Sequence, residues 1–214
     1  MMKKRVFCLA LALMLLFAVS AQADGAKSYY RRVQYGTLMP YDNLVYGYSL
    51  GVYSRFIMLN DEQMESVWAD IDANHEEGDE ELYDLRIWVA PDLRYEFEIQ
   101  VKEPTYDSFE TEVANAAGYI DLVRDGFAPE NHVRQLHDGI LRETPAGTML
   151  ETAIAYDTVD ADTGAEQTIV FLYYDYYGAG VEICFSIRDY QGNYDDTQSL
   201  LDSMMQTIEV GLRI

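Results

Sequence analysis

The run 93–102 constrains the fold most strongly, because apolar and polar side chains alternate through it without a break. The apolar members are Leu93, Tyr95, Phe97, Ile99 and Val101, and the polar members are Arg94, Glu96, Glu98, Gln100 and Lys102. A period of two residues is typical of a β-strand with one buried face. The residues 85–89 alternate in the same way, and Pro91-Asp92 supplies a turn between the two runs. The sequence therefore predicts a β-hairpin with one apolar face.

Three other segments have apolar residues at helical spacing, and each begins with capping chemistry. We expect helices over about 60–71, from 107 or 108 to 125, and from 195 or 196 to 206. The first follows a capping-box variant, Asn60-Asp61-Glu62-Gln63. The expected apolar faces consist of Met64, Val67, Trp68 and Ile71, of Phe109, Val113, Ala116, Ile120 and Val123, and of Leu201, Met204, Met205 and Ile208.

Four further segments are strand-like: one around 133, then 149–156, 168–177 and 181–188. Turn residues at 144–147 and 160–164 separate them, which is typical of an antiparallel meander. The predicted fold class is therefore α+β, with a central antiparallel sheet and helices packed on it.

The first 23 residues have the pattern of an export signal. Lys3, Lys4 and Arg5 precede an apolar run that ends in the small-residue exit Ala21-Gln22-Ala23. We expect cleavage after Ala23 and a secreted or periplasmic protein without a membrane span after cleavage, since no later apolar stretch approaches the required length. Residues 24–43 have no clear period and are expected to form an N-terminal arm or linker, followed by one domain over 44–214.

The chain carries 15 basic and 37 acidic side chains, a formal charge of −22. Such a surface repels phosphate backbones and anionic headgroups, so nucleic acid is excluded as the expected partner. Cys184 is the one cysteine outside the predicted signal, so no intramolecular disulfide is expected. We expect a packed and inert thiol at Cys184, because the surrounding residues are apolar.

The order of these elements resembles the PsbP-like superfamily. The resemblance runs from Leu44 to Val210 and rests on 46–53, the capped helix after Asn60, the meander and the closing run 200–208. It implies an α/β/α sandwich with a central antiparallel sheet. The superfamily includes the extrinsic photosystem protein and many small exported bacterial proteins of unknown role. The resemblance also implies a binding or assembly factor, not an enzyme.

A serine-hydrolase pattern, G-x-S-x-G, is present around Ser49. A nucleophile elbow needs a helix directly after the serine, whereas the residues after Ser49 look extended. The favoured interpretation of Ser49 is a strand residue between two glycines. The histidines favour no zinc site, because His75 lacks a second histidine at helical spacing and because His132 and His137 point to opposite faces of a strand.

Two weak candidate sites remain. Asp157, Asp160, Asp162 and Glu166 offer oxygen ligands in a loop around Gly164, which could surround calcium, although a polar hairpin loop explains the same residues. No other cofactor is expected.

The second candidate is the aromatic run 171–177. Its tyrosines, Tyr173, Tyr174, Tyr176 and Tyr177, could bind carbohydrate by ring stacking, or could belong to a central strand that is covered on both faces. We therefore expect a non-enzymatic binding or assembly protein with a protein or cell-envelope partner. The alternatives are an extracellular hydrolase acting on carbohydrate or ester, and a weak calcium-dependent interaction module.

Overall fold

The computed structural model describes residues 35–74, 81–124, 127, 131–159, 164–178 and 180–211. The strands are β1 (Leu38–Asn43), β2 (Tyr48–Tyr53), β3 (Ile57–Met58), β4 (Leu82–Val89), β5 (Tyr95–Lys102), β6 (Arg134–Gln135), β7 (Ile140–Thr144), β8 (Gly147–Val159), β9 (Glu166–Gly178), β10 (Val181–Asp189) and β11 (Glu209–Val210). The helices are α3 (Asp61–Asn74), α4 (Phe109–Asn115), a 3-10 helix (Ala116–Gly118), α5 (Tyr119–Val123) and α6 (Tyr194–Met205).

The strands form two antiparallel sheets. The larger, 8-stranded sheet has the order β3-β4-β5-β10-β9-β8-β6, with β7 paired to β8, and the smaller sheet has the order β1-β2-β11. The predicted meander is confirmed, because β8, β9 and β10 are consecutive neighbours. The predicted fold class, α+β with a central antiparallel sheet, is confirmed as well.

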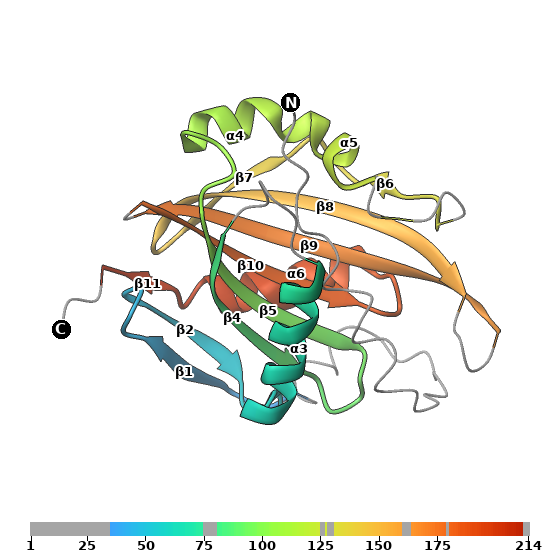
Figure 1. The fold of residues 1–214 in the computed structure, drawn as a ribbon, viewed down its shortest axis with the longest axis horizontal. Helices are drawn as coiled ribbons and strands as arrows, with labels where there is room; N and C mark the ends of the chain where they lie inside the picture. Colours follow the sequence, from blue (N-terminus) through green and yellow to red (C-terminus); the bar gives the residue numbers. More distant parts are fainter. Residues whose placement is uncertain are drawn as a thin grey trace.

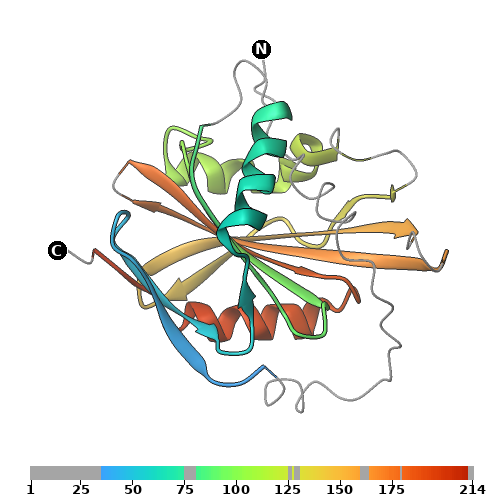
Figure 2. The same ribbon diagram turned by 60° about the horizontal axis from the view of Figure 1, so that its bottom comes forward.

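Helices cover both faces of the large sheet (Figures 1 and 2). On one face, Leu200 and Leu201 of α6 share a core with Phe97 and Phe185, and the small sheet joins this layer through β2. On the opposite face, α3 packs on β4, α4 lies over β9 and β10, and α5 lies over β8 and β9. The molecule is therefore an α/β/α sandwich, as predicted.

The hairpin of β4 and β5 confirms the alternating pattern, with two differences. Leu93, expected at the start of the second strand, lies in the turn with a φ of 57°. The charged face of β5 is also buried, since Glu96 and Glu98 are only 6% and 7% exposed. The reason is the position of β5, which lies between β4 and β10 inside a sheet that is covered on both faces.

The starts of α3 and α4 agree with the capping signals, whereas α6 begins at Tyr194, earlier than expected, because Asn193 is its N-cap. At α3 the Gln63 backbone N–H donates to Asn60 Oδ1 and the Asn60 N–H donates to Gln63 Oε1, each at 3.0 Å. This is the reciprocal pattern of a capping box. The second predicted helix starts after Ser108, whose hydroxyl accepts from the Thr111 N–H, but it is divided into α4 and α5 by the 3-10 helix.

Ordered structure begins before Leu44, which corrects the expected boundary. Residues 38–43, assigned to the arm from sequence, form β1, and Tyr35 is fully buried against Tyr95. Pro40 and Asp42 interrupt the alternation that would identify this strand in the sequence. The structure tolerates them because β1 is an edge strand that, among the described strands, pairs only with β2. The predicted signal peptide lies outside the described residues. Among the helices that the structure describes, none has the length and apolarity needed to cross a membrane.

Candidate functional site

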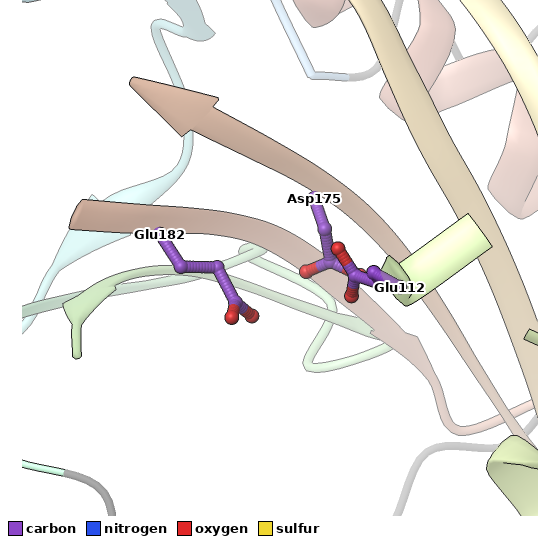
Figure 3. Close-up of side chains that lie close together, drawn as sticks. All are labelled: Glu112, Asp175 and Glu182. Carbon is purple, nitrogen blue, oxygen red and sulfur yellow. The ribbon is translucent and has the colours of Figure 1, made fainter. Parts of the chain in front are cut away.

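Three carboxylates meet beneath α4. Glu112 comes from α4, Asp175 from β9 and Glu182 from β10, and an oxygen of each lies within 4.8 Å of the others. Figure 3 shows the carboxyl groups of Glu112 and Asp175 side by side and Glu182 next to them. All three side chains are buried. Sequence reasoning missed this cluster, because it depends on the register of β9 against β10 and on the packing of α4.

Donors from the protein occupy the carboxylate of Glu182. The Lys102 ammonium lies 2.8 Å from Glu182 Oε1, and the Thr105 N–H and the Tyr177 hydroxyl each donate to Oε2 at 2.9 Å. Carboxylate oxygens are the ligands that calcium and magnesium prefer, but a carboxylate already held by an ammonium and two hydrogen bonds binds a cation less well. These contacts of Glu182 instead connect β10 to β5, β9 and the segment before α4.

A dense hydrogen-bond network surrounds Glu151 on the α6 side of the sheet. The fully buried Glu151 carboxylate accepts from Arg142 Nε at 2.6 Å, from the Tyr174 hydroxyl at 2.9 Å and from the Tyr194 hydroxyl at 2.5 Å. Burial alone would raise the pKa of Glu151, but these hydrogen bonds, with Arg142 first, favour the charged form and lower it. Glu151 is therefore ionised at neutral pH.

His137 extends this network. Its Nδ1 accepts from the Gly139 N–H at 3.2 Å, so the neutral ring carries its proton on Nε2. Nε2 lies 3.0 Å from Glu151 Oε1, without the alignment of a hydrogen bond. A histidine beside a carboxylate and a tyrosine could act in acid–base chemistry. Here, however, Glu151 is inaccessible and its oxygens are engaged by α6 and β7, so the arrangement holds elements together.

Glu96 and Glu98 on β5 form a further pair that the sequence did not single out. Arg188 Nη1 lies 2.9 Å from Glu96 Oε1, whereas burial raises the pKa of Glu98, which accepts from Gln100. An acid with a raised pKa beside a second carboxyl group is a combination that glycosidases use. Both side chains and Arg188 are buried, so a sugar polymer has no access to them.

The tyrosines proposed as a ligand platform lie on both faces of β9. Tyr173 packs beneath α5, with its ring centroid 5.9 Å from that of Tyr119. Tyr174 faces α6 and is buried beside Glu151. Burial is the main reason why the pKa values of both tyrosines are raised.

The other two tyrosines lie nearer the end of β9. Tyr176 packs, partly buried, against the α6-side core. Tyr177 donates to Glu182, and its ring centroid lies 6.0 Å from that of Phe109 on α4. The structure therefore shows these rings packed between layers, and carbohydrate binding at them stays a prediction.

The residues of the calcium hypothesis are only partly described. Asp160 and Asp162 lie outside the described residues, while Asp157 and Glu166 lie near the facing ends of β8 and β9. Asp157 accepts from the Thr168 hydroxyl at 2.7 Å and from Arg134 at 3.1 Å, and these two bonds lower its pKa. The structure thus gives Asp157 a role in the strand pairing, and calcium binding here stays a prediction.

Ser49 and Cys184 have the local structure that their sequence surroundings favour. Ser49 lies within β2, opposite Asp42 on β1 and Glu209 on β11, and the strand continues to Tyr53 with no helix directly after the serine. Cys184 is a buried free thiol, and burial, with Asp175 nearby, raises its pKa well above the usual value. Neither residue has the environment of an activated nucleophile.

One exposed apolar feature stands out at the turn between β1 and β2. Leu44 is 55% exposed and Val45 is 84% exposed, and Tyr83 on the neighbouring β4 is also exposed. Of the nine large apolar side chains exposed among the described residues, six lie within 39–83 (Met39, Leu44, Val45, Ile57, Met58 and Tyr83). We call Leu44, Val45 and Tyr83 the apolar tip. Clustered exposed apolar side chains mark interaction sites.

The apolar tip is held by hydrogen bonds from the residues beneath it. Asn43 Oδ1 accepts from the Val45 and Tyr46 N–H groups at 3.1 Å, and Asn43 Nδ2 donates to Asp84 Oδ2 at 2.9 Å. Burial, followed by the proximity of Asp84 and Tyr83, raises the pKa of Tyr46. The turn is therefore fixed against β4, and Leu44 and Val45 project from a rigid base.

Comparison with known proteins identifies a fold and no sequence family. No family model and no curated protein sequence matches the chain. Among solved structures, cyanobacterial PsbP (CyanoP) from Synechocystis sp. PCC 6803 is similar, with a TM-score of 0.52, 12% identity, and coverage of 91% of this chain and 99% of that chain. The Ran-binding protein Mog1p of Saccharomyces cerevisiae has a TM-score of 0.43 and 11% identity, with coverage of 81% and 96%. The predicted PsbP-like fold is confirmed, and the likeness concerns the fold alone.

Proposed function

We propose that this chain is an exported, non-enzymatic binding or assembly protein that acts outside the cytoplasmic membrane by contacting another protein. The observation that carries the proposal is the apolar tip, where Leu44 and Val45 are exposed on a base that hydrogen bonds make rigid. Rigid apolar groups dock with little loss of conformational entropy, so a fixed turn is a better docking element than a mobile one.

The polar clusters support a binding role over a catalytic one. The carboxylates of Glu151, Glu96 and Glu182 are buried and engaged by protein cations and hydroxyls that connect neighbouring elements. A hydrolase needs such groups in a cleft that admits its substrate. The PsbP-like fold, whose members are typically binding or assembly factors, and the signal-peptide pattern at 1–23 support the rest of the proposal.

Site-directed photocrosslinking tests this proposal. The mature chain with Val45→Cys is labelled with a thiol-reactive benzophenone, which should spare Cys184 because that thiol is buried. Leu141→Cys is the matched control, because Leu141 is 53% exposed. It lies on β7, which pairs with β8 in the large sheet, whereas Val45 lies in the turn between β1 and β2 of the small sheet. We expect one discrete adduct with a protein of the cell envelope from position 45 and none from position 141. Equal adducts from both positions, or none from either, would contradict the proposal.

A further inference from the structure

We infer that the apolar tip inserts into an apolar pocket with a basic rim on a partner protein. The inference rests on the proposed function and specifies the chemistry of the partner at the same site. Leu44 and Val45 supply the apolar contact, and the carboxylates around the tip determine which kind of surface can receive it.

Acidic side chains flank the tip on the small sheet. Asp42 pairs with Ser49, and Ser49 pairs with Glu209, so the three residues form one row across β1, β2 and β11. Directly opposed residues of antiparallel strands project from the same face of the sheet. Both carboxylates of this row are exposed, and Asp42 precedes Leu44 by two residues. A pocket that accepts Leu44 therefore brings its rim close to two negative charges.

A third carboxylate lies at the base of the tip. Asp84 accepts from Asn43 and lies 3.2 Å from the Arg86 guanidinium, which is 41% exposed. The charge of Asp84 is thus balanced within the protein, whereas Asp42 and Glu209 form no ion pair with the residues that the structure describes. Among the described charged residues at the tip, the carboxylates of Asp42 and Glu209 therefore exceed the cations, in keeping with the formal charge of −22 for the chain.

This charge selects among the possible occupants. An anionic lipid surface would repel the row of Asp42 and Glu209, although a bilayer could accept Leu44 and Val45. A second copy of the chain would bring the same carboxylates against them, and like charges across an interface are unfavourable. A protein pocket rimmed by Lys or Arg satisfies both the apolar and the acidic groups, so we assign this occupant.

The test uses the protein captured at position 45, purified and applied to immobilised mature chain. Leu44→Ser should weaken binding about tenfold to a hundredfold, as expected for removal of one buried leucine. Leu141→Ser, the control with the same substitution at a similarly exposed leucine, should leave binding unchanged. The association rate of wild type should fall several-fold between about 50 mM and about 500 mM salt, because salt screens attraction between rim charges. Asp42→Asn with Glu209→Gln should flatten this salt dependence. Circular dichroism and thermal unfolding check that each variant is folded.

The outcomes separate the inference from the proposed function. An association rate that is insensitive to salt and to the Asp42 and Glu209 substitutions overturns the basic rim, while binding through the tip stands. An adduct at position 45 that joins two copies of the chain also overturns the basic rim, while binding through the tip stands. Vesicles of phosphatidylcholine, with and without phosphatidylglycerol, provide the lipid arm, and vesicle binding that Leu44→Ser abolishes overturns the protein partner. Absence of any adduct at position 45 is instead a failure of the proposed function.

Discussion

At the scale of single residues, buried charges are placed where they join elements. Arg94 and Asp189 are the clearest pair: both are buried, and the guanidinium donates to Asp189 from Nε at 2.9 Å and from Nη2 at 2.7 Å. Asp189 Oδ2 also accepts from the Asn193 N–H and the Thr197 hydroxyl at the start of α6. One carboxylate thus fixes β10, the β4–β5 turn and α6 together.

Removing Asp189 should be strongly destabilising. Asp189→Ala leaves the Arg94 guanidinium buried without its main counterion, and breaking such a pair costs about 3–5 kcal/mol. Asp121→Ala is the control, because Asp121 and its partner Arg124 are both largely exposed. That change should cost less than about 1 kcal/mol. Urea unfolding of both variants measures the difference, and similar losses would show that burial of the pair contributes little.

Two buried glutamates should change stability with pH in opposite directions. The folded-state pKa of Glu151 is lowered, so its contribution to stability is present above the unfolded pKa of about 4.5 and is lost as the pH falls through the folded value. The folded-state pKa of Glu98 is raised by burial. Above about pH 4.5, Glu98 therefore ionises more readily in the unfolded chain than in the folded protein, and this difference lowers the free energy of unfolding.

The corresponding glutamine variants test these signs. Glu151→Gln should be less stable than wild type at pH 7, and the difference should shrink below about pH 4.5. Glu98→Gln should be more stable than wild type at pH 7, and this gain should vanish in acid. The free energy of unfolding, measured from pH 3 to pH 8, gives both differences. Curves that run parallel to wild type would refute the assigned protonation states.

At the scale of elements, the sequence predicts what local signals determine. The alternation over 93–102 and the capping residues at Asn60 and Ser108 predict β5, α3 and α4, because these patterns depend on neighbours a few residues apart. The short strands β1 and β7 were not predicted, since they alternate poorly and are formed by pairing with β2 and β8. Local pattern is insufficient for strands that are stabilised by pairing with a neighbouring strand.

The α3 cap gives a quantitative test at this scale. Asn60→Ala removes the acceptor for the Gln63 N–H and should destabilise the protein by about 1 kcal/mol. Glu65→Ala, on the exposed face of the same helix, should change stability by less than about 0.5 kcal/mol. Thermal unfolding of the two variants makes the comparison. An Asn60 variant as stable as the Glu65 variant would show that the cap is dispensable.

At the scale of the whole molecule, the sheet register and the helix layers create the sites. Glu112, Asp175 and Glu182 are unremarkable in a chain with 37 acidic residues, and they meet only when α4 lies over β9 and β10. The apolar tip was missed for another reason. Leu44 fell at the expected boundary between arm and domain, so its exposure on an ordered turn could not be foreseen. The pattern of elements predicted an α+β fold with a central antiparallel sheet, and the resemblance to the PsbP-like superfamily implied the sandwich.

The proposed export concerns the whole chain and can be measured directly. We expect the protein recovered outside the cytoplasmic membrane to begin at Asp24, because the small residues at Ala21 and Ala23 match a signal-peptidase site. Intact-mass spectrometry of the recovered protein reads this terminus. Lys3→Glu with Lys4→Glu should reduce export, whereas recovery of a chain that still begins at Met1 would contradict cleavage.

Competition for the adduct at position 45 tests the central claim, binding through the apolar tip, most directly. The labelled Val45→Cys chain is exposed to envelope protein together with an excess of unlabelled competitor, and the yield of the adduct is measured. Unlabelled wild type and Leu141→Ser should both suppress the adduct, because they present an intact tip. Leu44→Ser should suppress it much less. Equal suppression by all three competitors would contradict the account, since binding would then not depend on Leu44.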